Sequence, residues 1–195
     1  MMNYIKKSLA LSTVVAKKMA THDPHQLEKL RVRLKSRFGK PTGMHMTGIP
    51  LGISAIFALF CYAMQQVAVS VIIFKWLMIP EYKVLAGVFC AAIVYAILIV
   101  TTMFATARGS LIGFKIYLFL IALTGIVATI FFFSSFYSLL ADNITNYTPQ
   151  ITALLGMIFL LINCKWLNSS LFYRSVALCL HNRVLRKQMK EGNHS

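Results

Sequence analysis

Side chains that could carry out acid–base, metal or nucleophilic chemistry are scarce in this chain. Its 195 residues include only five Asp and Glu, five His and four Cys. The acidic residues and histidines lie in the ends and between the long apolar stretches, and none lies near the middle of such a stretch. Proton-coupled transporters, intramembrane hydrolases and lipid-transferring enzymes need such groups within the membrane. We therefore expect a non-catalytic protein.

The histidines and cysteines show no ligand pattern for a metal or a cofactor. Pro24 separates His22 from His25 and disfavours a shared helix face, so we assign no metal site there. The four cysteines are Cys61, Cys90, Cys164 and Cys179. Because no two of them form a C-x-x-C pair, we expect free thiols that behave as small hydrophobic groups. The sequence predicts neither a metal nor a cofactor.

Amide and hydroxyl side chains inside the apolar stretches are the remaining candidates. Gln65, Gln66 and Ser70 lie in the first stretch, and Asn163 lies in the fourth. An amide in hydrocarbon seeks a hydrogen-bond partner, usually on a neighbouring helix. Adjacent helical residues point about 100° apart, so the two glutamines should serve different neighbours. We predict that these four residues pack the helix bundle or bind a partner, with Asn163 as an intramolecular partner for the glutamines.

Four long apolar stretches define the elements that would position these side chains. Of all residues, 58% are hydrophobic and 13% are charged, and the charges fall mostly outside the stretches. A hydrocarbon core about 30 Å thick needs roughly 20 apolar residues in a helix. The expected spans are 48–74, 84–107, 111–140 and 148–171. The predicted fold is all-α, a four-helix transmembrane bundle over 48–173, with basic amphipathic cytosolic helices at both ends.

The two ends are predicted to form basic helices. Residues 1–47 make an N-terminal arm, in which 1–20 form a retained amphipathic helix rather than a signal peptide because lysines follow the short apolar run. Residues 23–39 combine an N-cap at Asp23 with leucines at helical spacing. Residues 174–195 form a basic tail that continues the last helix. The cations expected to contact anionic lipid are Lys29, Arg31, Arg33, Lys35, Arg37, Arg183, Arg186, Lys187 and Lys190.

Small residues mark places where two helices could approach closely. Ala105, Gly109 and Gly113 are spaced by four across the turn between the second and third stretches. Because a turn interrupts this motif, it predicts a tight hairpin rather than a dimer seam. Gly87 and Ala91 form a better small-xxx-small pair within the second stretch.

The distribution of Lys and Arg predicts the orientation in the membrane. They gather at both ends, with Arg108 and Lys115 in the middle turn, whereas 141–150 contains none. By the positive-inside rule both termini are cytoplasmic and the loops near 75–83 and 141–150 face outward. The strength of this bias favours a bacterial inner membrane. The net charge of +15 is then explained by anionic lipid headgroups, so no nucleic-acid partner is expected.

The architecture favours an accessory or interaction protein. We expect a subunit of a larger envelope complex, or an immunity- or exclusion-type protein that acts on another membrane protein. The alternative is a small homo-oligomeric transporter or channel for a neutral solute. Its path would be lined by Gln65, Gln66, Tyr95, Thr101, Thr124 and Asn163.

Overall fold

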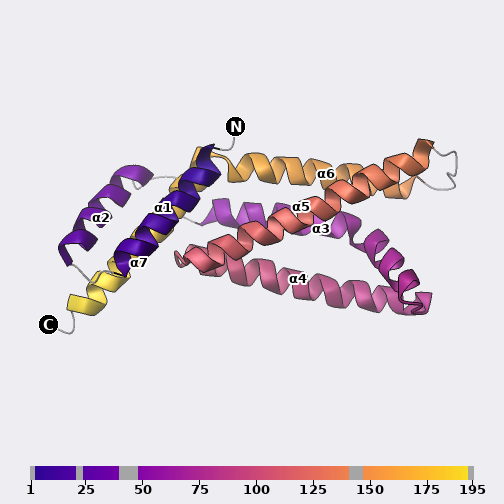
Figure 1. The fold of residues 1–195 in the computed structure, drawn as a ribbon, viewed down its shortest axis with the longest axis horizontal. Helices are drawn as coiled ribbons and strands as arrows, with labels where there is room; N and C mark the ends of the chain where they lie inside the picture. The colour runs from indigo at the N-terminus through magenta and orange to yellow at the C-terminus, as the bar shows by residue number, and fades with distance from the viewer. Residues whose placement is uncertain (1–2, 21–23, 40–47, 141–146, 193–195) are drawn as a thin grey trace. The chain divides into compact units, whose positions relative to one another are not determined.

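The computed structural model describes residues 3–20, 24–39, 48–140 and 147–192, and this part of the chain is helical with short turns (Figure 1). The helices are α1 (Asn3–Met19), α2 (Pro24–Phe38), α3 (Ile49–Trp76), α4 (Val84–Ala107), α5 (Leu111–Leu140), α6 (Thr148–Leu167) and α7 (Ser170–Gly192). A 3-10 turn, Glu81–Lys83, precedes α4. The described residues contain no strand, which confirms the predicted all-α class.

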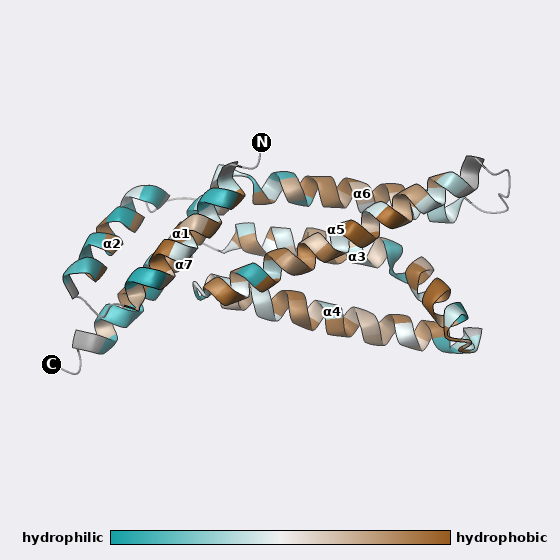
Figure 2. Ribbon diagram, in the orientation of Figure 1, coloured by the Kyte–Doolittle hydropathy of each residue, from teal (hydrophilic) through white to brown (hydrophobic). Residues whose placement is uncertain are grey.

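Four of these helices are long and apolar enough to cross a membrane. They are α3, α4, the Leu111–Tyr137 part of α5, and α6, with lengths of 28, 24, 27 and 20 residues. At about 1.5 Å per residue, even the shortest spans roughly 30 Å. Figure 2 shows hydrophobic residues dominating α3–α6 and hydrophilic residues gathering on α2. The predicted membrane class with four spans is confirmed.

The last span ends at Leu167, four residues before the expected boundary, and the helix does not continue unbroken into the tail. Ser169 caps a new helix, because its hydroxyl oxygen accepts a 3.1 Å hydrogen bond from the backbone N–H of Phe172. Beside it, Asn168 accepts a 3.1 Å hydrogen bond from the backbone N–H of Tyr4. Side chains of this type bond to nearby backbone groups instead of continuing a helix, which explains the break.

The chain divides into two compact units, which we describe separately. The terminal-helix unit comprises the described parts of 1–54, 101–118 and 165–195. The span unit comprises the described parts of 55–100 and 119–164. Helices α3–α6 contribute residues to both units.

Helix α7 is the centre of the terminal-helix unit. Both α1 and α2 pack along it (Figure 1). The predicted leucine face of α2 is confirmed, since Leu27, Leu30 and Leu34 are all buried. The middle of α7, residues 175–180, is buried without interruption. Six consecutive buried residues cover every face of a helix, so its neighbours enclose this part of α7.

The turn between α4 and α5 belongs to the same unit and forms the expected hairpin. Gly109 adopts a left-handed backbone with φ of +79°, a conformation that glycine adopts without steric penalty. Ser110 then caps α5, with its hydroxyl oxygen accepting a 3.2 Å hydrogen bond from the N–H of Gly113. A Cβ added to Gly113 would lie 2.5 Å from that of Ala105, so the small residues allow the two helices to meet.

Aromatic rings join helices within the span unit. The rings of Phe60 and Phe159 stack at 5.3 Å between centroids, joining α3 to α6. Phe74 of α3 occupies space that any side chain at Gly87 of α4 would fill. Gly87 therefore serves helix packing within one chain, which accounts for the small residue at this position.

Candidate functional site

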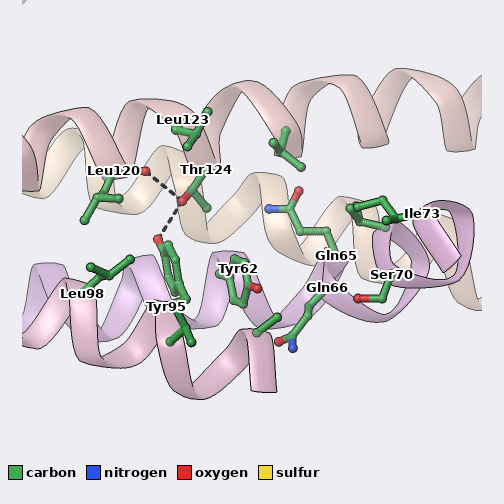
Figure 3. Close-up of a pocket in the computed structure, with 14 residues that line it drawn as sticks. Tyr62, Gln65, Gln66, Ser70, Ile73, Tyr95, Leu98, Leu120, Leu123 and Thr124 are labelled. Atoms are coloured by element: carbon green, nitrogen blue, oxygen red, sulfur yellow. Dashed lines mark hydrogen bonds between the residues drawn. The ribbon is translucent and has the colours of Figure 1, made fainter. Parts of the chain in front are cut away.

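The span unit contains a cavity of about 400 Å³ between α3, α4 and α5 (Figure 3). Its wall is mainly apolar, and the polar side chains on it are Tyr62, Gln65, Gln66, Ser70, Tyr95 and Thr124. No charged residue is among the described residues that line it. Ligand pockets in proteins commonly have this size and this mixture of an apolar wall with a few polar groups.

A hydrogen-bonded relay fixes two of the polar side chains. The Thr124 hydroxyl donates to the carbonyl oxygen of Leu120 at 2.9 Å, one turn back along α5. The Thr124 and Tyr95 hydroxyl oxygens are 2.7 Å apart, and because the Thr124 proton is already used, Tyr95 is the donor between them (Figure 3). Both hydrogens are therefore committed to protein acceptors. On the other side of Tyr95, the ring of Tyr62 stacks on it at 4.0 Å between centroids and 13° between planes.

The two adjacent glutamines point in different directions, as helical geometry requires (Figure 3). Gln66 donates to the carbonyl oxygen of Val88 and so joins α3 to α4. Gln65 is only 3% exposed, and its amide nitrogen donates to the carbonyl oxygen of Cys61 at 2.8 Å on its own helix. Of the two expected neighbour contacts, Gln66 therefore makes one, while Gln65 bonds within α3.

The side-chain oxygen of Gln65 is buried and has no hydrogen-bond partner among the described residues. Rotating the amide by 180° would not relieve this, because it would place oxygen against the Cys61 carbonyl oxygen and lose the 2.8 Å bond. Buried polar atoms in folded proteins are nearly always hydrogen-bonded. The cavity thus contains one unsatisfied acceptor.

Four of the six residues predicted for a neutral-solute path meet at this cavity: Gln65, Gln66, Tyr95 and Thr124. Ser70, predicted for packing or partner binding, lines it as well. Asn163 is 1% exposed in α6 but is not part of the cavity lining, and Thr101 is exposed on α4. Tyr62 was missed by sequence reasoning. Its position three residues before Gln65, on one face of the same helix, was the signal that could have found it.

A second concave site lies in the terminal-helix unit. This basic groove has a volume of about 310 Å³ and is lined by Lys7, Ala10, Leu11, Val14, Leu30, Arg33, Leu34, Arg37 and Tyr173. Three cations thus stand over a floor of leucine, valine and alanine side chains from α1 and α2. Among the residues that the structure describes, no acidic residue lines the groove. The acidic Glu28 of α2 instead pairs with Arg31 at 3.3 Å and accepts a hydrogen bond from Gln188 at 3.0 Å.

Three of the four predicted lipid-contacting cations of α7 have partners inside the protein. Arg183 donates to the carbonyl oxygen of Gly109 at 2.7 Å, and Arg186 donates to that of Arg108 at 3.0 Å. Lys187 donates to the carbonyl oxygen of Met19 at the end of α1. These carbonyls lie at or just beyond helix C-termini, where cations satisfy unpaired carbonyls and the helix dipole. Contact with anionic lipid stays a prediction for all nine cations.

One thiol lies close to this capping contact. Burial raises the pKa of Cys179 to about 11, while the guanidinium of Arg186 and a backbone hydrogen bond act in the opposite direction. The predominant form at neutral pH is therefore the thiol rather than the reactive thiolate.

Among the residues that the structure describes, no three His, Cys, Asp or Glu side chains gather where they could hold a metal ion. Comparison of the chain with models of protein families, with curated proteins and with solved structures finds no match. The cavity and the basic groove are therefore the features from which a function can be argued.

Proposed function

We propose that this chain is a non-catalytic, multi-pass membrane protein that works by binding an acidic segment of another membrane protein. It would serve as a subunit of a larger envelope complex or as an immunity- or exclusion-type protein. The observation that carries the proposal is the basic groove, in which three cations surround an apolar floor and no acidic residue is among the described lining residues.

The arrangement of cations in the groove favours an anionic occupant. Arg33 and Arg37 are four residues apart on α2, so they lie on one helix face, and Lys7 of α1 lines the same groove. Like charges at this spacing repel by about 0.2–0.5 kcal/mol. A bound carboxylate would reverse the sign of that interaction, and arginine is suited to bind carboxylates through two parallel hydrogen bonds.

The apolar floor favours a helical occupant over a single ion. Ala10, Leu11 and Val14 of α1 give the groove an accessible hydrophobic strip alongside its cations. An amphipathic helix with apolar residues at i, i+3 and i+4 could place that face on the strip and its carboxylates against the cations. Anionic lipid headgroups would pair with the cations but would not cover the hydrophobic strip. A lipid surface is therefore the alternative occupant that the tests must distinguish from a partner helix.

The membrane and the orientation are part of the same proposal. We infer a bacterial inner membrane with both termini in the cytoplasm, because Lys and Arg gather at the ends of the chain. Reporter domains that are active only outside the cytoplasm should be active when fused at Asn143 and inactive at Gly39, Gly109 and Ser195. Activity at Ser195 would require an odd number of spans and would reverse the assignment of the basic groove to the cytoplasm.

Site-specific photocrosslinking in the native host tests the docking proposal. A photoreactive residue at Val14, which lines the groove and is 44% exposed, should give one defined crosslinked product. The same residue at Thr13, exposed on another face of α1 and outside the groove, should not. Arg37→Glu should abolish the product, whereas Lys29→Glu, an equal charge change on α2 outside the groove, should leave it. Crosslinks to lipid alone, or equal effects of the two reversals, would refute partner docking.

The second candidate function, a neutral-solute path through a homo-oligomer, is favoured by the four path residues that line the span-unit cavity. Liposomes containing the chain would then show substrate-dependent flux of a small neutral solute. That flux should be lost in Gln66→Leu, while circular dichroism checks that the variant is folded. Absence of flux across neutral solute classes would count against this function.

A further inference from the structure

We propose that the span-unit cavity is a binding site for a neutral, lipid-soluble molecule with a hydroxyl group, whose proton is accepted by the side-chain oxygen of Gln65. This inference concerns the span unit only and does not depend on docking at the basic groove. It combines two independent observations, which are the cavity itself and the unsatisfied acceptor of Gln65, a residue that lines it.

The acceptor calls for a donor on the ligand. Gln65 is 3% exposed and its amide nitrogen is held by the Cys61 carbonyl, so the oxygen cannot turn away to find a partner. A buried acceptor without a donor leaves its desolvation uncompensated. A hydroxyl or N–H group entering the cavity would remove that penalty.

The other polar groups on the wall agree with a donor ligand. The hydroxyl protons of Tyr95 and Thr124 are both engaged within the protein, so these groups offer a ligand oxygen atoms only. One N–H of the Gln66 amide is likewise occupied, by the carbonyl oxygen of Val88. A donor ligand would thus meet acceptor oxygens on Tyr95 and Thr124 as well as on Gln65.

The rest of the wall sets the ligand's charge and solubility. The described residues that line the cavity include no Lys, Arg, Asp or Glu, so a charged molecule would lose hydration without gaining a counter-ion. Valine, leucine and isoleucine side chains from α3, α4 and α5 supply hydrocarbon contacts along its length. A neutral alkylphenol or long-chain alcohol has both required parts, a donor head and an apolar chain.

Water and bulk lipid are the competing occupants. An ordered water needs two to four polar partners, and here most of the wall offers none. An acyl chain of bulk lipid would match the wall but leave the Gln65 oxygen unsatisfied. The test must therefore separate recognition of a hydroxyl from simple filling by hydrocarbon.

The experiment uses the full chain in lipid nanodiscs and a photoreactive alkylphenol with a diazirine in its alkyl chain. Mass spectrometry should locate the label on the cavity-lining parts of α3, α4 and α5. Two competitors are compared: 4-octylphenol, and 4-octylanisole, in which a methyl group replaces the donor hydrogen. One net hydrogen bond predicts that the phenol competes at about fivefold lower concentration. Gln65→Leu should reduce that ratio to about one.

Matched variants on α4 test where the probe binds. Ala91 lines the cavity, so Ala91→Leu should fill it and strongly reduce labelling. Ala86 is exposed outside the cavity, so Ala86→Leu should leave labelling unchanged. Labelling spread over all lipid-facing positions, or equal competition by the two compounds in the parent protein, would overturn the proposal and assign the cavity to bulk lipid. The comparison of the two competitors in the parent protein tests the proposal even if Gln65→Leu fails to fold.

Discussion

Replacement of Gly109 by alanine should loosen the attachment of α7 to the hairpin between α4 and α5. Two costs follow from the structure. The left-handed backbone, with φ of +79°, costs a residue with a Cβ about 1 kcal/mol. The added Cβ would also lie 2.9 Å from the carbonyl oxygen of Cys179 and 3.0 Å from the Cβ of Arg183. Backbone atoms cannot move aside independently, so the hairpin and α7 must separate.

That separation weakens the hydrogen bond from Arg183 to the Gly109 carbonyl, which is 2.7 Å long and charge-assisted. Such bonds contribute about 1.5–3 kcal/mol. Allowing for partial relaxation of the arginine side chain, we expect a total loss of about 3 kcal/mol. This corresponds to roughly a hundredfold loss of protection from hydrogen exchange in α7.

Two glycine variants serve as controls. Gly39 has φ of +76° with no atom within 4 Å of an added Cβ, so Gly39→Ala incurs the backbone cost alone, about 1 kcal/mol. Gly52 lies within α3 with open space around it, so Gly52→Ala should be neutral or stabilising by about 0.5–1 kcal/mol. Hydrogen exchange measured by mass spectrometry in nanodiscs gives the protection of α7 in each variant. If Gly109→Ala leaves that protection within threefold of the parent, the packing described for this hairpin is wrong.

Three further expectations follow from single contacts in the terminal-helix unit. Alkylation of Cys179 by iodoacetamide should be slow at pH 8 in the folded protein and should accelerate toward pH 11, because only the thiolate reacts. Arg186→Gln should slow the reaction further, because it removes a charge that lowers the pKa of this thiol. Rapid reaction at pH 7 would contradict the buried position of Cys179. The buried hydroxyl of Tyr117 donates a 2.9 Å hydrogen bond to that of Ser54. A double-mutant cycle of Tyr117→Phe and Ser54→Ala should therefore give a coupling of about 1 kcal/mol in unfolding free energy. Additive effects of the two substitutions would exclude this hydrogen bond. Leu34 is fully buried, so Leu34→Ala should destabilise the docking of α2 on α7 by about 2–4 kcal/mol. The loss would be measured as faster hydrogen exchange in α2. An effect below about 0.5 kcal/mol would show that this face of α2 is not packed.

The membrane class and the helix bounds were predictable because hydrocarbon thickness imposes a length on apolar runs. Three spans agree with their predicted bounds within two residues at each helix end. The fourth ran past its true end because residues after Leu167 still include apolar and aromatic side chains. The capping role of Ser169, which ends the run, depends on the backbone path and is weakly encoded in composition.

The role of α7 could not be predicted from its own residues. Its stripe of Arg183, Arg186 and Lys187 has the same periodicity whether these cations face lipid or cap other helices. Only the tertiary structure shows that carbonyls at the ends of α1 and α4 accept their hydrogen bonds. The choice between these two uses depends on neighbours far away in sequence, which a local pattern does not contain.

The cavity, too, could be predicted from the sequence only in part. Sequence reasoning selected Gln65, Gln66, Tyr95 and Thr124 because polar side chains in hydrocarbon are costly and need partners. It could not show that Gln66 is satisfied by a backbone carbonyl while the oxygen of Gln65 is not. That difference arises from the direction of each side chain relative to α4 and α5.

The mass and composition of the native assembly test the central claim most directly. The tagged chain would be taken from its own host at native level into lipid-preserving nanodiscs and measured by native mass spectrometry. We predict a defined, stoichiometric partner that is lost when Arg33 and Arg37 are both changed to Glu. The partner should be retained when Lys29 and Lys35, exposed on α2 outside the groove, are changed in the same way. A chain found alone or only with copies of itself, with a mass that neither double variant alters, would contradict partner docking at the basic groove.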